Sequence, residues 1–264
     1  MAVWQRSRRY RGRLRCYCYP TGSFSRMTSI RETRVVVVIP TYNEVGNIEK
    51  LTRLLFSLGI VNLSLIVVDD NSSDATADVV RMLASEFPVT LIEREKKLGL
   101  GTAYIAGFQK ALRVPCDVII QMDGDLSHDP HDIPRFLESI ALSDVVLGSR
   151  YISGGGSLAW SARRQALSRL SNLYARTILR LPYHDITSGF KCFRKEVLAA
   201  LPLDRFISVG YVFQVETTYR AHQRRFRIAE MPIIFHKRET GRSKLTWRII
   251  FESCWKIFKL RLHG

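Results

Sequence analysis

Short apolar runs rich in β-branched residues alternate with amphipathic segments along the first part of the chain. The apolar runs lie at residues 35–39, 65–68, 89–92, 118–122 and 145–147, and the amphipathic segments lie near 47–58, 76–87, 102–113 and 131–142. Continuous apolar runs of this length are typical of strands that are buried on both faces. The alternation predicts βαβ units, and therefore an α/β fold with a mostly parallel sheet flanked by helices.

The regular alternation fades after residue 150. A glycine-rich loop at 154–156 precedes a helical stretch from about 160 to 180, and mixed strand and helix follow. We find no internal repeat and no convincing linker. The sequence therefore predicts a single domain over residues 35–244, with a basic leader at 1–34 and an amphipathic helix at 245–264.

Chemically rich loops follow the predicted strands. They read PTYNE at 40–44, DDNSSD at 69–74, KLGLG at 97–101, DGD at 123–125 and GSR at 148–150. In an open α/β sheet, ligands bind beyond the carboxyl ends of the strands. We therefore expect these five loops to converge on one rim of the sheet.

The strongest chemical signal is the pair Asp123 and Asp125, separated by one glycine and placed directly after a buried strand. Two carboxylates at this spacing can face one divalent cation, and hard oxygen ligands suit Mg²⁺ or Mn²⁺. The alternative is a solvated Asp-Gly turn. The position at a strand end favours the metal site.

Other loops on the same rim suit a nucleotide. One carboxylate of Asp69 and Asp70 is a candidate for hydrogen bonds from a base or a ribose, while the other, like Asp74, fits a turn or the start of a helix. Tyr42 and Glu44 leave a strand together, as a stacking ring and a polar contact would. Lys97 precedes glycines that open a helix, which favours anions.

Two further segments suit phosphate groups. Arg164 and Ser168 lie one helical turn apart on the same face, although an exposed basic helix face explains that spacing equally well. Residues 236–244, which include Arg238 and Lys244, gather cations and hydroxyl groups around a glycine.

Composition and charge narrow the class of protein. The chain has 264 residues, of which 46% are hydrophobic, so it can bury a real core. Its five cysteines show no disulfide or metal-ligand spacing, which indicates a reducing, cytosolic compartment. The net charge of +16 requires a polyanionic partner to be considered, yet half of it lies in the leader, which carries nine Arg and one acid.

No segment is apolar for long enough to span a membrane, and the start lacks the apolar region of a secretory signal. The leader fits a disordered tail, a gene start placed too early, a transit peptide or a lipid-binding tail. Residues 245–262 have charged positions on one side and Trp247, Phe251, Cys254, Phe258 and Leu262 on another. This pattern suits either a membrane interface or packing on the domain's own core.

Together, these motifs resemble family 2 glycosyltransferases of the GT-A fold, and among them the dolichol-phosphate (polyprenol-phosphate) mannose synthases. The likeness runs from about residue 35 to residue 244. The residues that carry it lie at 39–44, 68–74, 97–103, 122–130, 148–151, 187–191 and 238–244.

The resemblance implies transfer of mannose from GDP-mannose to a polyprenyl phosphate, with inversion at the sugar carbon. It assigns the nucleoside to Pro40, Tyr42, Glu44, Asp69 and Asp70, and the metal on the diphosphate to Asp123 and Asp125. It also assigns the donor-phosphate clamp to Arg150, Arg238 and Lys244, and the acceptor phosphate to Arg164 and Ser168. Some members have Gln where this chain has Ser127, so the resemblance does not extend to a third side-chain metal ligand here, and water could take that coordination place.

An acceptor phosphate needs no catalytic base, because its second pKa is about 6 and it is largely ionised at neutral pH. The expected enzyme is peripheral, on the cytoplasmic face of a membrane, and it contacts the membrane surface through the C-terminal helix. A dependence on a small membrane partner subunit stays open. So does a UDP-sugar donor such as UDP-glucose. A nucleic-acid-binding protein is the alternative of another class, but the sequence holds no nucleic-acid-binding motif.

Overall fold

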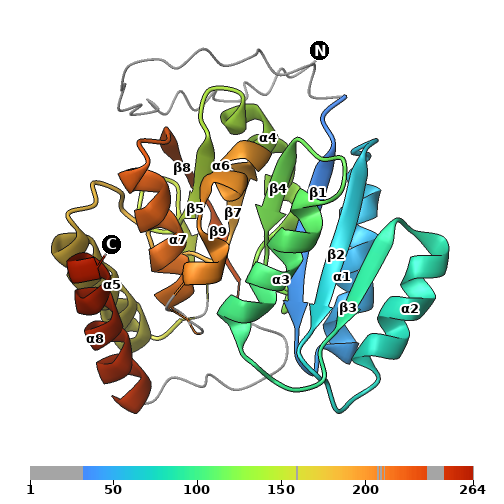
Figure 1. Cartoon of the computed structure of the whole chain (residues 1–264), viewed down its shortest axis with the longest axis horizontal. Helices are drawn as coiled ribbons and strands as arrows, with labels where there is room; N and C mark the ends of the chain where they lie inside the picture. The colour runs from blue at the N-terminus through green and yellow to red at the C-terminus, as the bar shows by residue number, and fades with distance from the viewer. Residues whose placement is uncertain are drawn as a thin grey trace, which may run out of the picture.

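The computed structural model describes residues 32–158, 160–206, 208, 210, 212–236 and 247–263. Its centre is a seven-stranded sheet in the order β3-β2-β1-β4-β7-β5-β8 (Figure 1). The strands are β1 (Val35–Thr41), β2 (Leu63–Asp69), β3 (Val89–Glu93), β4 (Val118–Gln121), β5 (Val145–Ser149), β7 (Lys191–Arg194) and β8 (Ile228–Pro232). A second sheet pairs β6 (Gly156–Ser157) with β9 (Ile234–Phe235).

The sheet is mostly parallel, as the sequence predicts. β1 pairs in parallel with β2 and β4, β2 with β3, and β5 with β8. β7 is the exception, because it runs antiparallel between β4 and β5. The alternating pattern of strands and helices ends before β7, so local pattern did not predict this reversed strand.

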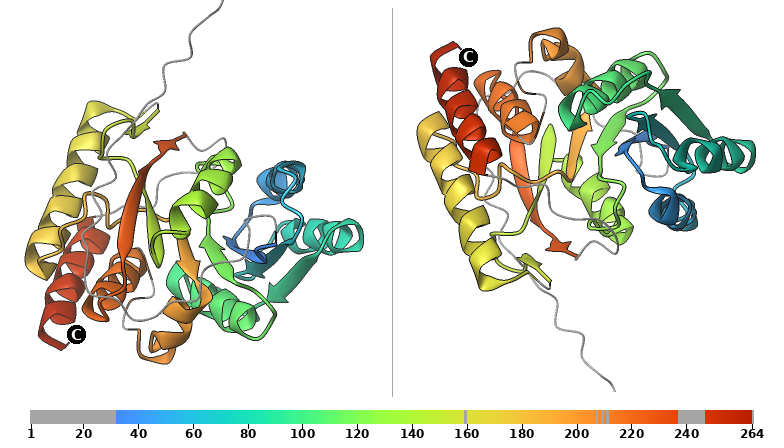
Figure 2. Two further views of the ribbon diagram at one scale, coloured as in Figure 1. Left: turned by 90° about the horizontal axis from the view of Figure 1, so that it is seen from above. Right: turned by 90° about the horizontal axis from the view of Figure 1, so that it is seen from below.

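Helices cover both faces of the sheet. They are α1 (Val45–Ser57), α2 (Thr76–Glu86), α3 (Leu100–Leu112), α4 (Ile133–Ile140), α5 (Ala162–Leu179), α6 (Lys195–Ala200), α7 (Val212–Gln223) and α8 (Trp247–His263). Seen along the sheet, α1 and α4 lie on one face and α3, α6 and α7 on the other (Figure 2). This confirms the predicted α/β fold of sheet and flanking helices.

The central strand β1 explains why both faces must be covered. Val36 and Val38 pack into one core cluster with residues of α3, whereas Val35, Val37 and Ile39 pack into a second cluster with residues of α1. Successive strand residues point to opposite faces, so an unbroken apolar strand needs a partner layer on each side.

The helix α8 lies beside α5 at one end of the sheet (Figures 1 and 2). It buries Ile257 and Leu260 and leaves Trp255, Phe258 and Leu262 exposed. One side of this helix therefore packs on the domain, as one of the two expectations has it, and another side presents apolar residues outward. Cys254, which the sequence places on the apolar face of this helix, lines a cavity.

None of the helices in the described part of the chain is long and apolar enough to cross a membrane. The predicted leader at 1–34 lies outside the described residues except for its last three positions. Arg238 and Lys244, the candidate cations near the C-terminus, also lie outside them.

Candidate functional site

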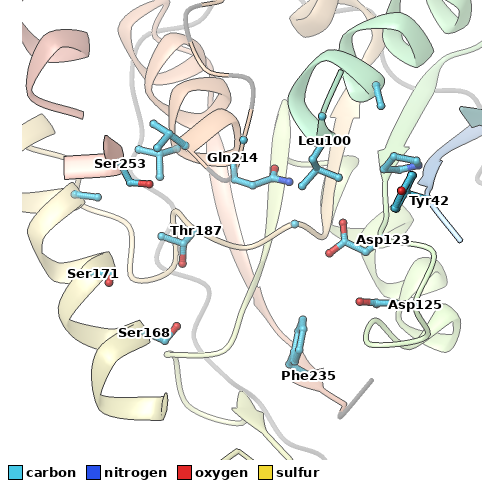
Figure 3. A pocket seen from close by; sticks show the side chains of 18 of the residues that line it. Tyr42, Leu100, Asp123, Asp125, Ser168, Ser171, Thr187, Gln214, Phe235 and Ser253 are labelled. Carbon is cyan, nitrogen blue, oxygen red and sulfur yellow. The ribbon is translucent and has the colours of Figure 1, made fainter. Parts of the chain in front are cut away.

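A single cavity of about 670 Å³ gathers most of the residues singled out in the sequence. It extends from the carboxyl ends of β1 and β4 to α5 and α8 (Figure 3). The candidates that line it are Pro40, Tyr42, Glu44, Asp70, Lys97, Asp123, Asp125, Arg150, Arg164 and Ser168. Asp69 is the one described candidate that is not part of the lining.

Two hydroxyl groups hold the carboxylate pair that follows β4. The Tyr104 hydroxyl donates to Asp123 Oδ1 at 2.7 Å, and the Ser127 hydroxyl and backbone N–H donate to Asp125 Oδ1. Burial raises the pKa of Tyr104 well above its usual value, and the Asp123 charge raises it further. Tyr104 therefore remains a protonated donor at neutral pH. Ser127 orients the Asp125 carboxylate through its two hydrogen bonds.

The carboxylate pair fits a divalent cation. Gly189 faces it so closely that a Cβ there would lie 3.0 Å from Asp123 Oδ2, so a side chain at this position would fill the space in front of the carboxylate. Among the described residues, no group of three or more His, Cys, Asp or Glu gathers around one point. Mg²⁺ commonly binds one or two carboxylates and takes its other ligands from phosphates and water. The two carboxylates of Asp123 and Asp125 match this mode of binding.

Tyr42 and Lys97 meet at the other end of the cavity. The Lys97 ammonium lies 3.3 Å from the centre of the Tyr42 ring, a cation–π contact. The loop that carries Lys97 is fixed by Asp70, whose carboxylate accepts the backbone N–H groups of Leu98 and Gly99 at 2.9 and 2.8 Å. This end thus combines an aromatic face with a positive charge.

The two neighbouring aspartates at the end of β2 accept hydrogen bonds that hold the surrounding loops in place. Asp69 accepts hydrogen bonds from Thr41 at 2.8 Å and from the Ser72 backbone at 2.8 Å, which ties the end of β1 to the next turn. Asp70 pairs with Arg94 at 2.9 Å in addition to holding the Lys97 loop. Asp74 accepts from the Thr76 backbone at the start of α2, as its predicted role at a helix start requires.

Arg150 forms a buried ion pair. Its Nε and Nη2 donate to Asp185 at 2.7 and 2.9 Å, and Nη2 also donates to Thr187 at 2.9 Å. Burial lowers the pKa of Arg150, but the Asp185 charge outweighs this and leaves the pKa above its usual value. The guanidinium also lies near the rings of Trp160 and Phe235. Asp185 therefore offsets the charge of Arg150. The two residues are 35 positions apart in the chain, so the sequence pattern did not indicate this partner.

The far end of the cavity joins hydroxyl and cationic groups to an apolar surface. Ser168 Oγ lies 2.6 Å from the Tyr151 hydroxyl, and the Arg164 guanidinium lies 4.3 Å from the centre of the Trp160 ring. Beyond them, the lining continues with Leu167, Tyr174 and Ala175 of α5, Val215 of α7 and Ile257 of α8. Arg164 and Ser168 thus share one end of the cavity.

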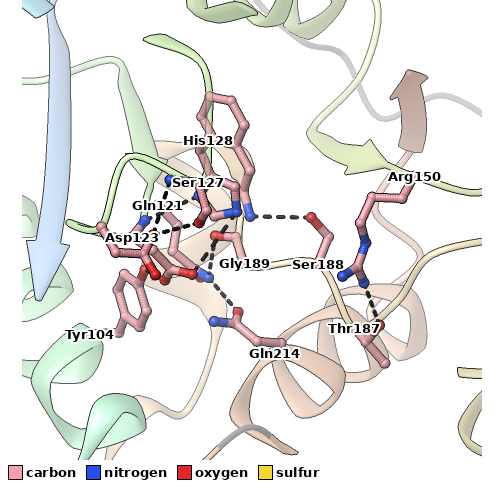
Figure 4. A network of polar contacts seen from close by, with 12 residues as sticks. Tyr104, Gln121, Asp123, Ser127, His128, Arg150, Thr187, Ser188, Gly189 and Gln214 are labelled. Atoms are coloured by element: carbon pink, nitrogen blue, oxygen red, sulfur yellow. Dashed lines mark hydrogen bonds and ion pairs between the residues drawn. The ribbon is translucent and has the colours of Figure 1, made fainter. Parts of the chain in front are cut away.

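A chain of side-chain amides beside the carboxylates was missed from the sequence (Figure 4). Gln121, at the end of β4, donates to the Gly189 carbonyl at 2.9 Å and to Gln214 Oε1. Gln214 lines the cavity from the first turn of α7. The two glutamines are 93 positions apart, so only the fold brings them together.

Comparisons with known proteins place these features in a family. A model of glycosyl transferase family 2 matches residues 36–201. Undecaprenyl-phosphate mannosyltransferase of Micrococcus luteus is 41% identical over 221 residues, which are 83% of this chain and 90% of that protein. Polyprenol monophosphomannose synthase of Mycolicibacterium smegmatis is 38% identical over 240 residues, which are 89% of this chain and 90% of that protein.

Solved structures share the fold at low identity. Glucosyl-3-phosphoglycerate synthase from Mycobacterium tuberculosis, in complex with Mn²⁺, UDP and phosphoglyceric acid, has a TM-score of 0.63 and 20% identity. That match covers 88% of this chain and 78% of the other. Another crystal structure of the same synthase has a TM-score of 0.61 and 21% identity, with 88% and 80% covered.

Proposed function

Since this chain belongs to glycosyl transferase family 2, we propose that it transfers mannose from GDP-mannose to a polyprenyl phosphate, with inversion at the sugar carbon. The relatives at 41% and 38% identity are by name a polyprenyl-phosphate mannosyltransferase and a polyprenol monophosphomannose synthase. Their likeness to this chain along most of its length supports the mannosyl donor and the lipid phosphate acceptor.

The observation that carries the proposal is the order in which different kinds of surface follow one another along one cavity. An aromatic and cationic end at Tyr42 and Lys97 leads to the carboxylates of Asp123 and Asp125, and then to Arg164 and Ser168. An apolar surface between α5 and α8 follows. A nucleotide, a diphosphate, a phosphate and a hydrocarbon chain would meet these surfaces in that order.

In the proposed donor site, the nucleoside lies against Pro40, Tyr42 and Glu44. Asp123 and Asp125 would hold Mg²⁺ or Mn²⁺, and when bound the ion would neutralise charge on the leaving diphosphate. The Mn²⁺ and UDP complex of the synthase with this fold is consistent with such an ion. Asp69 and Asp70 contribute by shaping the loops around the nucleotide.

Arg150, Arg238 and Lys244 are proposed as the donor-phosphate clamp. Arg150 would act as an oriented hydrogen-bond donor, because Asp185 offsets its charge. Its Nε and Nη2 are engaged by Asp185 and Thr187, which leaves the Nη1 side to meet a ligand. Electrostatic stabilisation of a leaving group is most effective when the donors are held in place beforehand.

The acceptor end supports a phosphate acceptor. The described residues that line it, Arg164, Leu167, Ser168, Ser171 and Tyr174, carry no carboxylate. An alcohol acceptor would need a general base within hydrogen-bond reach, whereas a phosphate monoester arrives already ionised. Catalysis would then consist of aligning a phosphate oxygen with the anomeric carbon and stabilising the diphosphate.

We propose that α5 and α8 meet the cytoplasmic surface of a membrane. Trp255, Phe258 and Leu262 on α8 and Leu170 and Leu173 on α5 are exposed, and the two helices are neighbours. Basic residues accompany them on both helices, which suits anionic lipid. Such contact would bring the apolar end of the cavity to the lipid acceptor, alone or with a small membrane partner subunit.

The proposal is tested by mixing the purified chain with radiolabelled GDP-mannose, polyprenyl phosphate in vesicles, and Mg²⁺ or Mn²⁺. We expect a mannosyl lipid, and we expect a chelator to abolish it. The variant Asp125→Asn should lose at least a hundredfold in rate while it remains folded. The exposed acid Asp78 offers the control Asp78→Asn, which should retain full activity.

The same assay distinguishes the donors. UDP-glucose in place of GDP-mannose should give little product, and the GDP donor should raise the melting temperature more than the UDP donor. Transfer from UDP-glucose alone would replace the proposed donor, and absence of any glycosyl lipid in the presence of metal would reject the acceptor.

A further inference from the structure

The cavity wall contains a buried polar group to which the proposed reaction assigns no role, the carboxamide of Gln214. Gln214 is 3% exposed and lines the wall between the carboxylates and the acceptor end, near Leu100 and Thr187 (Figure 3). A polar side chain buried in a cavity wall has a cost in free energy unless it is hydrogen-bonded.

A backbone carbonyl fixes which way this carboxamide points. The Gly189 carbonyl can only accept, so the Gln121 atom 2.9 Å from it must be the donor nitrogen Nε2. The same Nε2 donates to Gln214, so the atom it meets there must be the oxygen Oε1. The Gln214 Nε2 group is therefore turned away from Gln121 (Figure 4).

The Gln214 backbone is also held. The Lys191 ammonium, fully buried in β7, donates to the Gln214 carbonyl and to the Thr218 hydroxyl. The first turn of α7 is thereby anchored to the sheet. Within the described residues, no group accepts a hydrogen bond from Gln214 Nε2. A rigidly held donor thus faces the cavity.

The geometry points to Gln214 as the group that recognises a hydroxyl of the donor sugar, an inference that rests on the proposed function. The sugar must lie between the diphosphate at Asp123 and the acceptor phosphate at Ser168, and Gln214 borders this part of the cavity. A neutral amide donor suits a sugar hydroxyl, which accepts without carrying charge. Gln121 is a positioning residue, because its hydrogen bond orients the Gln214 carboxamide.

The test is a binding cycle with GDP-mannose and its 2-, 3-, 4- and 6-deoxy analogues, measured by calorimetry. With the wild-type protein, removal of one particular hydroxyl should weaken binding by roughly tenfold. With Gln214→Leu, the same removal should have little effect, because the partner is already gone. Gln214→Glu keeps the shape but cannot donate when ionised, and should resemble Gln214→Leu.

Two controls separate recognition from general damage. Gln223→Leu, at the exposed end of the same helix, should bind every donor as the wild type does. GDP lacks the mannose whose hydroxyl Gln214 would meet, so Gln214→Leu should bind GDP unchanged. Equal losses for each deoxy analogue in wild type and Gln214→Leu would overturn the inference, as would weakened GDP binding in a folded Gln214→Leu. If the binding measurements give the expected pattern but the wild-type protein transfers no mannose, the proposed function is rejected and the role of Gln214 in binding the sugar stands.

Discussion

Single hydroxyl groups set the orientation of the candidate metal ligands. Asp123 is held by Tyr104 and Asp125 by Ser127, from two different parts of the chain. Groups that hydrogen-bond to metal ligands fix their orientation and are commonly needed for full metal affinity. Removing one of these hydroxyls should therefore weaken the metal without removing a ligand.

Tyr104→Phe should lower the affinity for Mn²⁺ by about 10-fold to 100-fold, because Asp123 loses the donor at 2.7 Å. Titration of Mn²⁺ in the presence of GDP measures this. Tyr219→Phe is the matched control, since the buried Tyr219 hydroxyl has no hydrogen-bond partner among the residues that the structure describes. Equal Mn²⁺ affinities in the two variants would contradict the assigned role of Tyr104.

A second single residue, the buried Lys191, makes the stability of the folded protein depend on pH. Burial lowers its pKa from 10.5 to about 7, although Asp185 opposes this. Between these values the unfolded chain binds the proton and the folded chain does not, so this group adds stability as the pH rises from about 7 to 10.5. Chemical denaturation of wild type and Lys191→Met should show the wild type gaining relative to the variant over this range. A constant difference would contradict the lowered pKa.

At the scale of elements, the Arg150–Asp185 pair joins the residue after β5 to the loop before β7. Because β7 runs antiparallel between β4 and β5, that loop must return across the carboxyl edge of the sheet, and the pair fixes it there. The loop also carries Thr187 and Gly189, which face the cavity. One buried ion pair thus helps to position the metal-side wall of the site.

Asp185→Asn should destabilise the protein by about 3–5 kcal/mol at neutral pH, because it leaves the buried Arg150 charge without its partner. Burial raises the pKa of Asp185, but Arg150 outweighs this and keeps it below the ordinary 3.8. The contribution is therefore present above that pH and lost as the pH falls through the lower folded value. Denaturation at several pH values should show the difference from wild type shrinking in acid.

The pair Arg34 and Asp117 provides the comparison. It has similar hydrogen bonds, with Nε and Nη2 donating to the carboxylate, but both side chains are substantially exposed. Asp117→Asn should therefore cost much less than Asp185→Asn, because water solvates the remaining charge. Equal costs would mean that burial is not what makes the Asp185 pair important.

At the scale of the whole molecule, the cavity reaches from the sheet edge to the α5 and α8 pair. Ser253, Cys254 and Ile257 of α8 line it, while Trp255 and Phe258 of the same helix are exposed. The same helix therefore closes the apolar end of the site and presents apolar rings outward. A membrane contact on these rings would place the site at the lipid surface.

The double variant Trp255→Ala with Phe258→Ala should bind vesicles containing anionic lipid at least tenfold more weakly, because two exposed apolar side chains no longer enter the interface. Sedimentation with vesicles measures this, and binding of GDP should not change. Val61→Ala with Met82→Ala removes two exposed apolar residues elsewhere and should leave vesicle binding intact. Equal binding by both double variants would exclude this surface from the contact.

The sequence determined the architecture and the kind of chemistry. Buried β-branched runs and amphipathic helices are local patterns, and the rule that ligands meet the carboxyl ends of parallel strands then brought Tyr42, Lys97, Asp123 and Asp125 to one cavity. Those patterns needed no knowledge of distant contacts.

The tertiary structure decided what local pattern cannot encode. The reversed strand β7, the Asp185 partner of Arg150 and the pairing of Gln121 with Gln214 all join residues separated by tens of positions. Asp69 and Asp70 accept hydrogen bonds from the protein's own loops, and their residue type alone does not indicate those partners. A side chain's chemistry is written in the sequence, but its partners depend on which segments fold beside it.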